Sequence, residues 1–432
     1  MWSFISRLRR GSKTESGPGL QEALQESPQQ RLYRYRKQRG VNLGSWFVLE
    51  RWVSESPFQG AAGSGQSDLD VAKGLHAKQV LEQHWDSWIT STDFEWLAAR
   101  GINTVRIPIG YYHICALDPS ILTRTDFDGL QHVFEGAWSR LVAAVITAQS
   151  FGIGVLFDLH AAPGKQNKDS HSGTSSPVIS FFNGKFNMQL AIRALRMLVT
   201  QLIALRAHDS TFNNIVGVQL LNEPYPSSHE TLYNWLFARY GDEHQERASY
   251  IRAQLDLFEL YCAGSFFWTY KKEFSGDQGW SFRDAVENGV FPEVVGMIPV
   301  KDYVGLSAEI NARKVSARNV ALGQHVSYWA RFPSYYEHWR FEAGFDQGWV
   351  VAYDFFTFDR AGQPTVSELG FKGCIAKRKA QDHIRENGRS NNIWEFGECT
   401  IQGGFPFWVL PPLGRQHDIP AISISLSVKS QI

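Results

Sequence analysis

Apolar and polar positions follow a strand–helix rhythm along the middle of the chain. Short β-rich or apolar runs at residues 104–109, 152–160 and 215–222 predict strands, with helical spacing between them. The last two runs are nearly continuous in apolar residues, as expected of strands buried on both faces. This order predicts βαβ units and a parallel sheet.

The helical stretches fall at residues 93–100, 136–147 and 190–208, with Asp93 expected close to an N-cap. A later strand at 264–271 follows another long helical pattern. Beyond residue 293 the pattern changes to aromatic-rich helical stretches. We therefore expect four parts: a flexible arm at 1–30, a barrel-type domain at 31–297, a mainly helical extension at 298–402 and an irregular tail at 403–432.

Three of the predicted strands end in polar or ionisable residues: Arg106, His160, and the pair Asn222 and Glu223. In a (β/α)₈ barrel, active sites lie at the carboxyl ends of the strands. The pattern therefore predicts that these side chains gather at one end of the sheet.

Asn222-Glu223-Pro224 is the sharpest short motif. A glutamate can protonate a glycosidic oxygen, and a neighbouring amide can hydrogen-bond the sugar 2-hydroxyl. The alternative is a solvated strand-to-loop turn in which proline begins the next segment. The position after a buried strand, fourth in a βα series, favours the catalytic interpretation.

Composition narrows the functional classes. The 432 residues hold 43 basic and 43 acidic side chains, which argues against a nucleic-acid or anionic-membrane role because both need a basic excess. The four cysteines form no CxxC pair, so we expect no zinc cluster and no disulfide scaffold. We see neither a secretory h-region nor a run of about 18 apolar residues, so we expect a cytoplasmic protein without a membrane span.

Several longer segments resemble glycoside hydrolase family 5, especially its fungal exo-β-1,3-glucanase branch. They occur in the family's order and cover roughly residues 39–293: RGVNLGSWFVLERW, GINTVRIPIGYYHI, FDLHAAPGKQN, LLNEP and a long stretch around GSFFWTYKKEF. The resemblance implies a (β/α)₈ TIM-type barrel, a retaining mechanism with two glutamates, and a β-glucan or glucoside substrate.

The resemblance also implies site roles. Glu223 is the acid/base with Asn222 as its companion, Arg106 holds the nucleophile region and His160 lines the sugar subsite. Glu50 would bind a glucose hydroxyl, and Trp268 would form the platform under the ring. Each has a structural alternative: a buried arginine is normally paired, and the histidine and tryptophan are also common core residues.

The sequence departs from the family after the fourth strand. Only 39 residues lie between Pro224 and Gly264, whereas one βαβ unit needs about 30 or more. We therefore expect an internal deletion of barrel strands five to seven, near residues 225–250, which would remove the family's nucleophile. Two other carboxylates are candidates for that role: Glu398 in a WEFGEC context and Glu273 after the last strand.

Three hypotheses remain open: a β-glucan hydrolase, an inactive β-glucan-binding relative, and a truncated product without function. A second carboxylate close to Glu223 would discriminate between the first two. We expect no cofactor or metal, because two carboxylates suffice and no His/Asp cluster has ligand spacing, and we expect a monomer. The aromatic stretch YEHWRFEAGFDQGW could stack on sugars, but helical aromatic stripes are usually core, so we favour packing.

Overall fold

The computed structural model describes residues 27–182, 185–208, 212–224, 264–296, 307–358 and 364–403. The chain forms two compact units, each described here by itself. The first contains residues 1–297 together with 355–371, and the second contains residues 298–354 together with 372–432. Residues 1–26 of the arm predicted at 1–30, the long helical pattern before residue 264 and the tail from residue 404 lie outside the described residues. The last residues of the predicted arm are not irregular, because residues 28–30 form the first turn of a helix capped by Ser27.

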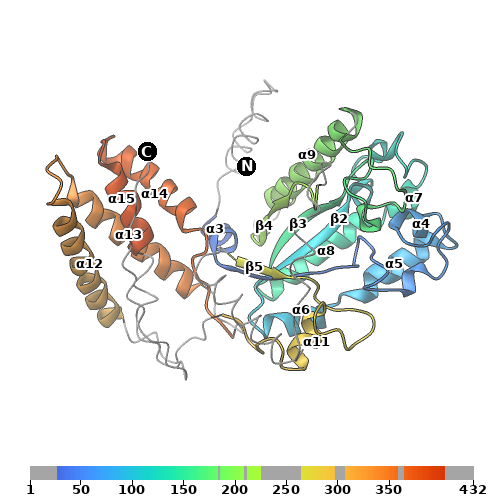
Figure 1. Ribbon diagram of the computed structural model, residues 1–432, viewed down its shortest axis with the longest axis horizontal. Coiled ribbons are helices and arrows are strands. Elements are labelled where there is room, and N and C mark those ends of the chain that lie inside the picture. The colour runs from blue at the N-terminus through green and yellow to red at the C-terminus, as the bar shows by residue number, and fades with distance from the viewer. Residues whose placement is uncertain are drawn as a thin grey trace. The chain divides into compact units, whose positions relative to one another are not determined.

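The first unit is built around a parallel sheet, drawn at the centre of its ribbon in Figure 1. Its strand order is β4-β3-β2-β1-β5, so the last strand in the sequence pairs with the first, as in a closed (β/α)₈ barrel. Five strands are described, and the arc they form is open between β4 and β5. The fold is therefore α/β, of TIM-barrel type and incomplete. The strands are β1 (Gln38–Asn42), β2 (Thr104–Gly110), β3 (Gly154–Ala161), β4 (Ile215–Gln219) and β5 (Gly264–Phe267).

The strand predictions are confirmed to within a few residues because burial on both faces leaves a continuous apolar signal. Every residue of β2 is buried, and all but one of β3. β4 ends at Gln219, earlier than expected, so Asn222 and Glu223 stand in the loop beyond it.

The helices of this unit follow the predicted rhythm. Asp93 lies close to the N-cap of its helix, as expected: Thr90 is the N-cap, and Asp93 stands three residues later and completes a capping box with it. The described helices are α3 (Pro28–Tyr35), α4 (Asp68–Ala72), α5 (Ala77–Trp88), α6 (Ser91–Ala98), α7 (Gln131–Phe134), α8 (Ala137–Ser150), α9 (Lys185–His208) and α11 (Phe282–Glu287).

Helix α9 contradicts the expectation that the chain has no segment long and apolar enough to span a membrane. Residues Phe186–Arg206 are long and apolar enough to do so by length and composition. The same helix places Leu190, Ala194 and Leu198 in the buried core of the unit. One face of the helix therefore packs against the core, although only 28% of the apolar stretch is buried.

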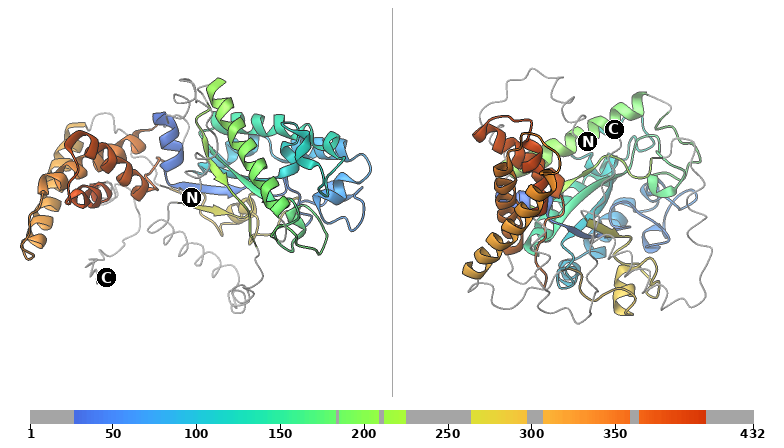
Figure 2. Two further views of the ribbon diagram at one scale, coloured as in Figure 1. Left: turned by 90° about the horizontal axis from the view of Figure 1, so that it is seen from above. Right: turned by 60° about the vertical axis from the view of Figure 1, so that its left-hand side comes forward.

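The second unit is helical throughout its described part, as Figure 2 shows. It contains α12 (Ser307–Trp329), α13 (His338–Thr357, whose last turn belongs to the first unit), α14 (Lys372–Asn387) and α15 (Ile393–Gly403). Gly344 of α13 lies so close to α15 that a Cβ there would stand 2.3 Å from the backbone oxygen of Phe396.

The aromatic stretch of α13 packs mainly inward. Phe341, Phe345 and Trp349 are almost fully buried, whereas Trp339 is about half exposed at 47%. The packing interpretation therefore describes most of this stretch.

Residues 355–371 return to the first unit after α13. Leu369 forms an antiparallel bridge with Arg36, and the backbone N–H of Lys37 donates to the carbonyl oxygen of Glu368. The Glu368 carboxylate makes a buried ion pair with Arg39 of β1. This segment therefore covers the entry into the first strand.

Candidate active site

Arg106 holds the centre of the site. It lies in the middle of β2, not at its end, opposite Asn42 of β1. Its Nη1 donates to Asn42 Oδ1 at 2.8 Å and its Nε to Gln219 Oε1 at 2.8 Å. Its Nη2 donates to Asn222 Oδ1 at 2.9 Å and lies 2.8 Å from Asp158 Oδ2. One guanidinium thus ties together the ends of β1, β3 and β4.

Asp158 and His160 of β3 point to the same side of the sheet because side chains alternate along a strand. Asp158 is fully buried, and its Oδ2 lies 2.7 Å from His160 Nδ1. The buried carboxylate is thus paired with both a guanidinium and an imidazole, and it fixes the direction of each.

Trp268 follows β5 and lies parallel to the His160 imidazole, with ring centroids 5.7 Å apart and an interplanar angle of 5°. The guanidinium carbon of Arg106 is 5.8 Å from the Trp268 ring centroid. Trp268 is only partly buried, so some of its surface is available to a ligand. The peptide bond between Trp268 and Thr269 is cis.

Asn222 and Glu223 differ sharply in environment. Asn222 is 5% exposed, and its carbonyl oxygen accepts from Gln166 Nε2 at 3.2 Å. The Glu223 side chain is 59% exposed. Its backbone has φ of +39°, which is uncommon for a residue with a Cβ, and its carbonyl oxygen accepts from Asn167 Nδ2. The turn after β4 thus buries the amide and presents the carboxylate to solvent.

His171 is the described partner of the Glu223 carboxylate. Its Nε2 lies 3.3 Å from Glu223 Oε2, and its Nδ1 lies 3.9 Å from Glu50 Oε2. Burial lowers the pKa of His171, but the contact with Glu223 and the charges of Glu50 and Asp169 outweigh it, so the pKa is raised. The same contact lowers the pKa of Glu223, with smaller contributions from His160 and Arg106.

Asp169 adds a second carboxylate beside Glu223. Asp169, His171 and Glu223 each place a carboxylate oxygen or ring nitrogen within 4.8 Å of those of the other two. Asp169 is exposed and directly precedes the short 3-10 turn Ser170–Ser172, in the loop after β3.

Glu50 is 5% exposed in the loop after β1. Its Oε2 accepts from Trp52 Nε1 at 2.8 Å, and among the described residues its buried Oε1 has no hydrogen-bond partner. Trp52 is 47% exposed and meets Trp280 edge to face at 5.7 Å. Glu50 therefore keeps one oxygen for a further donor, such as a hydroxyl.

The two other carboxylates named from the sequence have different surroundings. Glu273 Oε2 accepts from the backbone N–H groups of Glu55 and Ser56 and from the Ser54 hydroxyl, so it holds a turn. Glu398 lies in α15 of the second unit, and its side chain is outside the described ones.

Sequence reasoning missed Asp158, His171 and Asp169. The first had a usable signal, because Asp158 and His160 are two positions apart in a buried strand and must share a face. Nothing in the local pattern marks Asp169 or His171, because only the path of the loop brings them to Glu223.

A buried arginine–carboxylate–imidazole network, an aromatic platform and an exposed glutamate together suit a polar, ring-shaped ligand. Residues 310–407 match the family "Glucan 1,3-beta-glucosidase 3 C-terminal domain". Glucan 1,3-beta-glucosidase 3 of Schizosaccharomyces pombe is 25% identical over 421 residues, covering 74% of this chain and 86% of the relative.

The chain is similar in sequence to fungal proteins named glucan 1,3-beta-glucosidase. Glucan 1,3-beta-glucosidase 2 of Wickerhamomyces anomalus is 38% identical over 203 residues, covering 45% of this chain and 43% of that protein. The chain thus spans most of the first relative but under half of the second. The resemblance found from the sequence is confirmed.

Solved structures give weaker matches. The rutinosidase from Aspergillus niger matches with a TM-score of 0.36 and 19% identity, over 66% of this chain and 76% of that one. A glycoside hydrolase family 5 enzyme from Prevotella bryantii matches with a TM-score of 0.25 and 13% identity, over 88% of this chain and 99% of that one. Scores this low add nothing to the topology described above.

Proposed function

We propose that the chain hydrolyses terminal β-glucosidic bonds of β-1,3-glucan, with Glu223 as the acid/base group. The observation that carries the proposal is the exposed Glu223 carboxylate, set beside the buried Asn222 amide that Arg106 fixes. An amide in that place can hydrogen-bond the sugar 2-hydroxyl, and the carboxyl group can serve the glycosidic oxygen. The names of the relatives support the choice of substrate.

The other residues of the site would contact different parts of the sugar or position the groups that do. Trp268 offers an aromatic face to the apolar C–H face of a glucose ring. His160 is fixed by Asp158, and its Nε2 lies 3.4 Å from Asn222 Nδ2, so it helps to position that amide. Glu50 offers its unpartnered Oε1 to a sugar hydroxyl. These groups bind and orient a sugar, and Glu223 alone among them is an exposed proton donor or acceptor.

A retaining mechanism needs a second carboxyl group about 5–5.5 Å from the first. Among the described residues Asp169 comes within 4.8 Å of Glu223, so it is the first companion to test. Glu273 is engaged by three donors of one turn, which makes it the weaker candidate. Glu398 stays a candidate on its sequence context alone.

The test compares hydrolysis of an aryl β-glucoside and of laminari-oligosaccharides by the wild type and by Glu223→Gln. We expect turnover in the wild type and a loss of about 10²–10⁴-fold in the variant, the usual contribution of a general acid/base. Asp169→Asn, Glu273→Gln and Glu398→Gln follow under the same conditions. The variant that loses turnover while it keeps oligosaccharide binding carries the companion carboxylate.

A second candidate function is β-glucan binding without hydrolysis. The lowered pKa of Glu223 favours it, because a general acid needs a raised pKa to hold its proton near neutral pH. Absence of turnover from a folded wild type, together with laminari-oligosaccharide binding that Trp268→Ala abolishes, would establish binding and refute the hydrolase proposal.

A further inference from the structure

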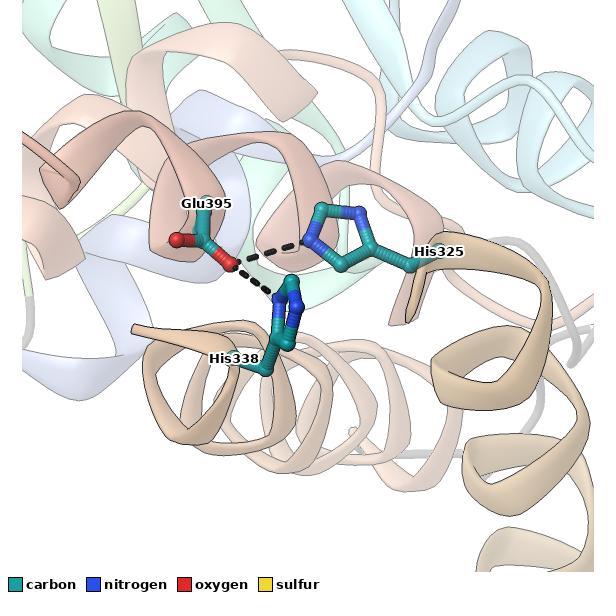
Figure 3. A group of neighbouring side chains, drawn as sticks. All are labelled: His325, His338 and Glu395. Atoms are coloured by element: carbon teal, nitrogen blue, oxygen red, sulfur yellow. Dashed lines mark hydrogen bonds and ion pairs between the residues drawn. The ribbon is translucent and has the colours of Figure 1, made fainter. Parts of the chain in front are cut away.

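Three side chains of the second unit converge on one point in Figure 3: His325 from α12, His338 from the start of α13, and Glu395 from α15. Their ligand atoms all lie within 4.8 Å of one another. His325 Nε2 and His338 Nδ1 lie 3.0 Å and 2.9 Å from the same oxygen, Glu395 Oε2.

The carboxylate of this cluster is fully buried, and burial of an ionised carboxylate is energetically unfavourable. Glu395 is 0% exposed and its other oxygen, Oε1, accepts from the backbone N–H of Glu337 at 2.7 Å. Among the described residues this carboxylate thus contacts two imidazoles and one backbone amide, and no lysine or arginine. A buried carboxylate normally needs a positive charge or a metal ion beside it.

Surrounding groups hold the three side chains in these directions. The His325 ring stacks on Phe341 with centroids 4.0 Å apart, and the His338 ring stacks on Tyr336 with an interplanar angle of 11°. Such supporting contacts orient ligands before a metal arrives. The His338 side chain is 29% exposed, so the cluster has one open side.

We propose that His325, His338 and Glu395 form a binding site for a divalent transition-metal ion of the zinc type. Two imidazoles and one carboxylate are a ligand set that zinc takes in proteins, with water in the remaining position. In the metal-free arrangement His325 Nε2 and His338 Nδ1 both face Glu395 Oε2. To bind a metal ion, each imidazole would present the lone pair of that nitrogen and carry its ring proton on the other one. The bound ion would supply the missing charge and join α12, α13 and α15 at one point.

The spacing of these residues explains why no metal was expected from the sequence. His325 and His338 stand 70 and 57 positions before Glu395, far outside the short spacings of recognisable zinc motifs. The site exists only after three helices have packed together. Nothing in the proposal depends on hydrolysis or on the groups around Glu223.

The test uses the full-length chain without a histidine tag, stripped with a chelator and titrated with ZnCl₂ by calorimetry. We expect one zinc ion per chain and a rise in melting temperature, because a ligand that binds only the folded state stabilises it. His338→Ala and Glu395→Gln should each weaken binding by about tenfold or more. His338 is partly exposed, so its variant should stay folded even if Glu395→Gln does not.

His171→Ala is the matched control, because Asp169, His171 and Glu223 form the other such group in the described part of the chain. It should leave the binding of one zinc ion unchanged. The proposal is overturned if the folded wild type binds no zinc. It is equally overturned if His338→Ala binds as the wild type does, or if His171→Ala is the variant that loses the ion.

Discussion

The candidate site shows what single residues contribute. Arg106 makes hydrogen bonds to three side chains and an ion pair to Asp158, so it positions the site and has little capacity left for a ligand. Two interpretations were possible for Arg106: a structural ion pair, or a residue that holds the site in place. The same contacts serve both. Glu223, in contrast, has one described ionic partner, His171.

The pair of Glu223 and His171 makes a prediction about pH. The raised pKa of His171 means that its proton favours the folded state, so this contribution is complete below the unfolded-state value and is lost as pH rises through the folded-state value. The lowered pKa of Glu223 acts in the opposite sense: its contribution is lost as pH falls. The ion pair therefore exists in the window between the two pKa values.

Glu223→Gln should lower the pKa of His171, because it removes the carboxylate whose contact with the ring, together with its charge, contributes most to raising it. The measurement is an NMR titration of the histidine ring protons in both proteins, with the other histidines as internal controls. An unchanged His171 titration would contradict the contact seen in the structure.

At the scale of elements, the sequence predicts where the strands lie. It does not predict the contacts that distant segments make with them. The run that became β3 is nearly continuous in apolar residues, and all but one residue of that strand is buried. The strand order follows from barrel topology once the family resemblance is known. The contribution of Glu368 to β1 could not be predicted, because an ion pair over more than 300 positions leaves no local pattern.

The pairing of β1 with β5 depends on Gly40. A Cβ at this position would lie 2.3 Å from ring atoms of Phe266, its neighbour on β5. We expect Gly40→Ala to lower the free energy of unfolding by about 1–3 kcal/mol, the usual cost of overpacking. Urea denaturation of the full chain measures it.

The matched experiment repeats Gly40→Ala in a Phe266→Ala background. Removal of the ring makes room for the new methyl group. Gly40→Ala should therefore lower the free energy of unfolding clearly less in the Phe266→Ala background than in the wild type. Equal costs in the two backgrounds would show that the close approach is not what makes glycine necessary.

At the scale of the whole molecule, the division into units does not follow the order of the chain. Residues 355–371 complete the first unit from within the region that the sequence analysis assigned to the helical extension. The Arg39–Glu368 ion pair, with side chains 5% and 3% exposed, is part of that completion. A single boundary near residue 297 therefore leaves out part of the first unit.

Glu368→Gln should destabilise the first unit by about 3 kcal/mol, because it removes the carboxylate that balances a buried guanidinium. Glu287→Gln is the control: its ion pair with Arg283 is exposed, so the expected cost is about 0–1 kcal/mol. Thermal unfolding of the full chain compares the two. Similar melting temperatures for both variants would show that residues 355–371 do not stabilise the sheet.

The return of residues 355–371 also sets an order of events during synthesis. A ribosome releases the chain from the amino end, and domains fold as their residues emerge. The strands β1 to β5 emerge first, yet Glu368, whose carboxylate pairs with Arg39 of β1, appears only after α12 and α13 have been made. The newborn sheet must therefore wait for the segment that completes the start of β1 until two helices of the second unit have already been made.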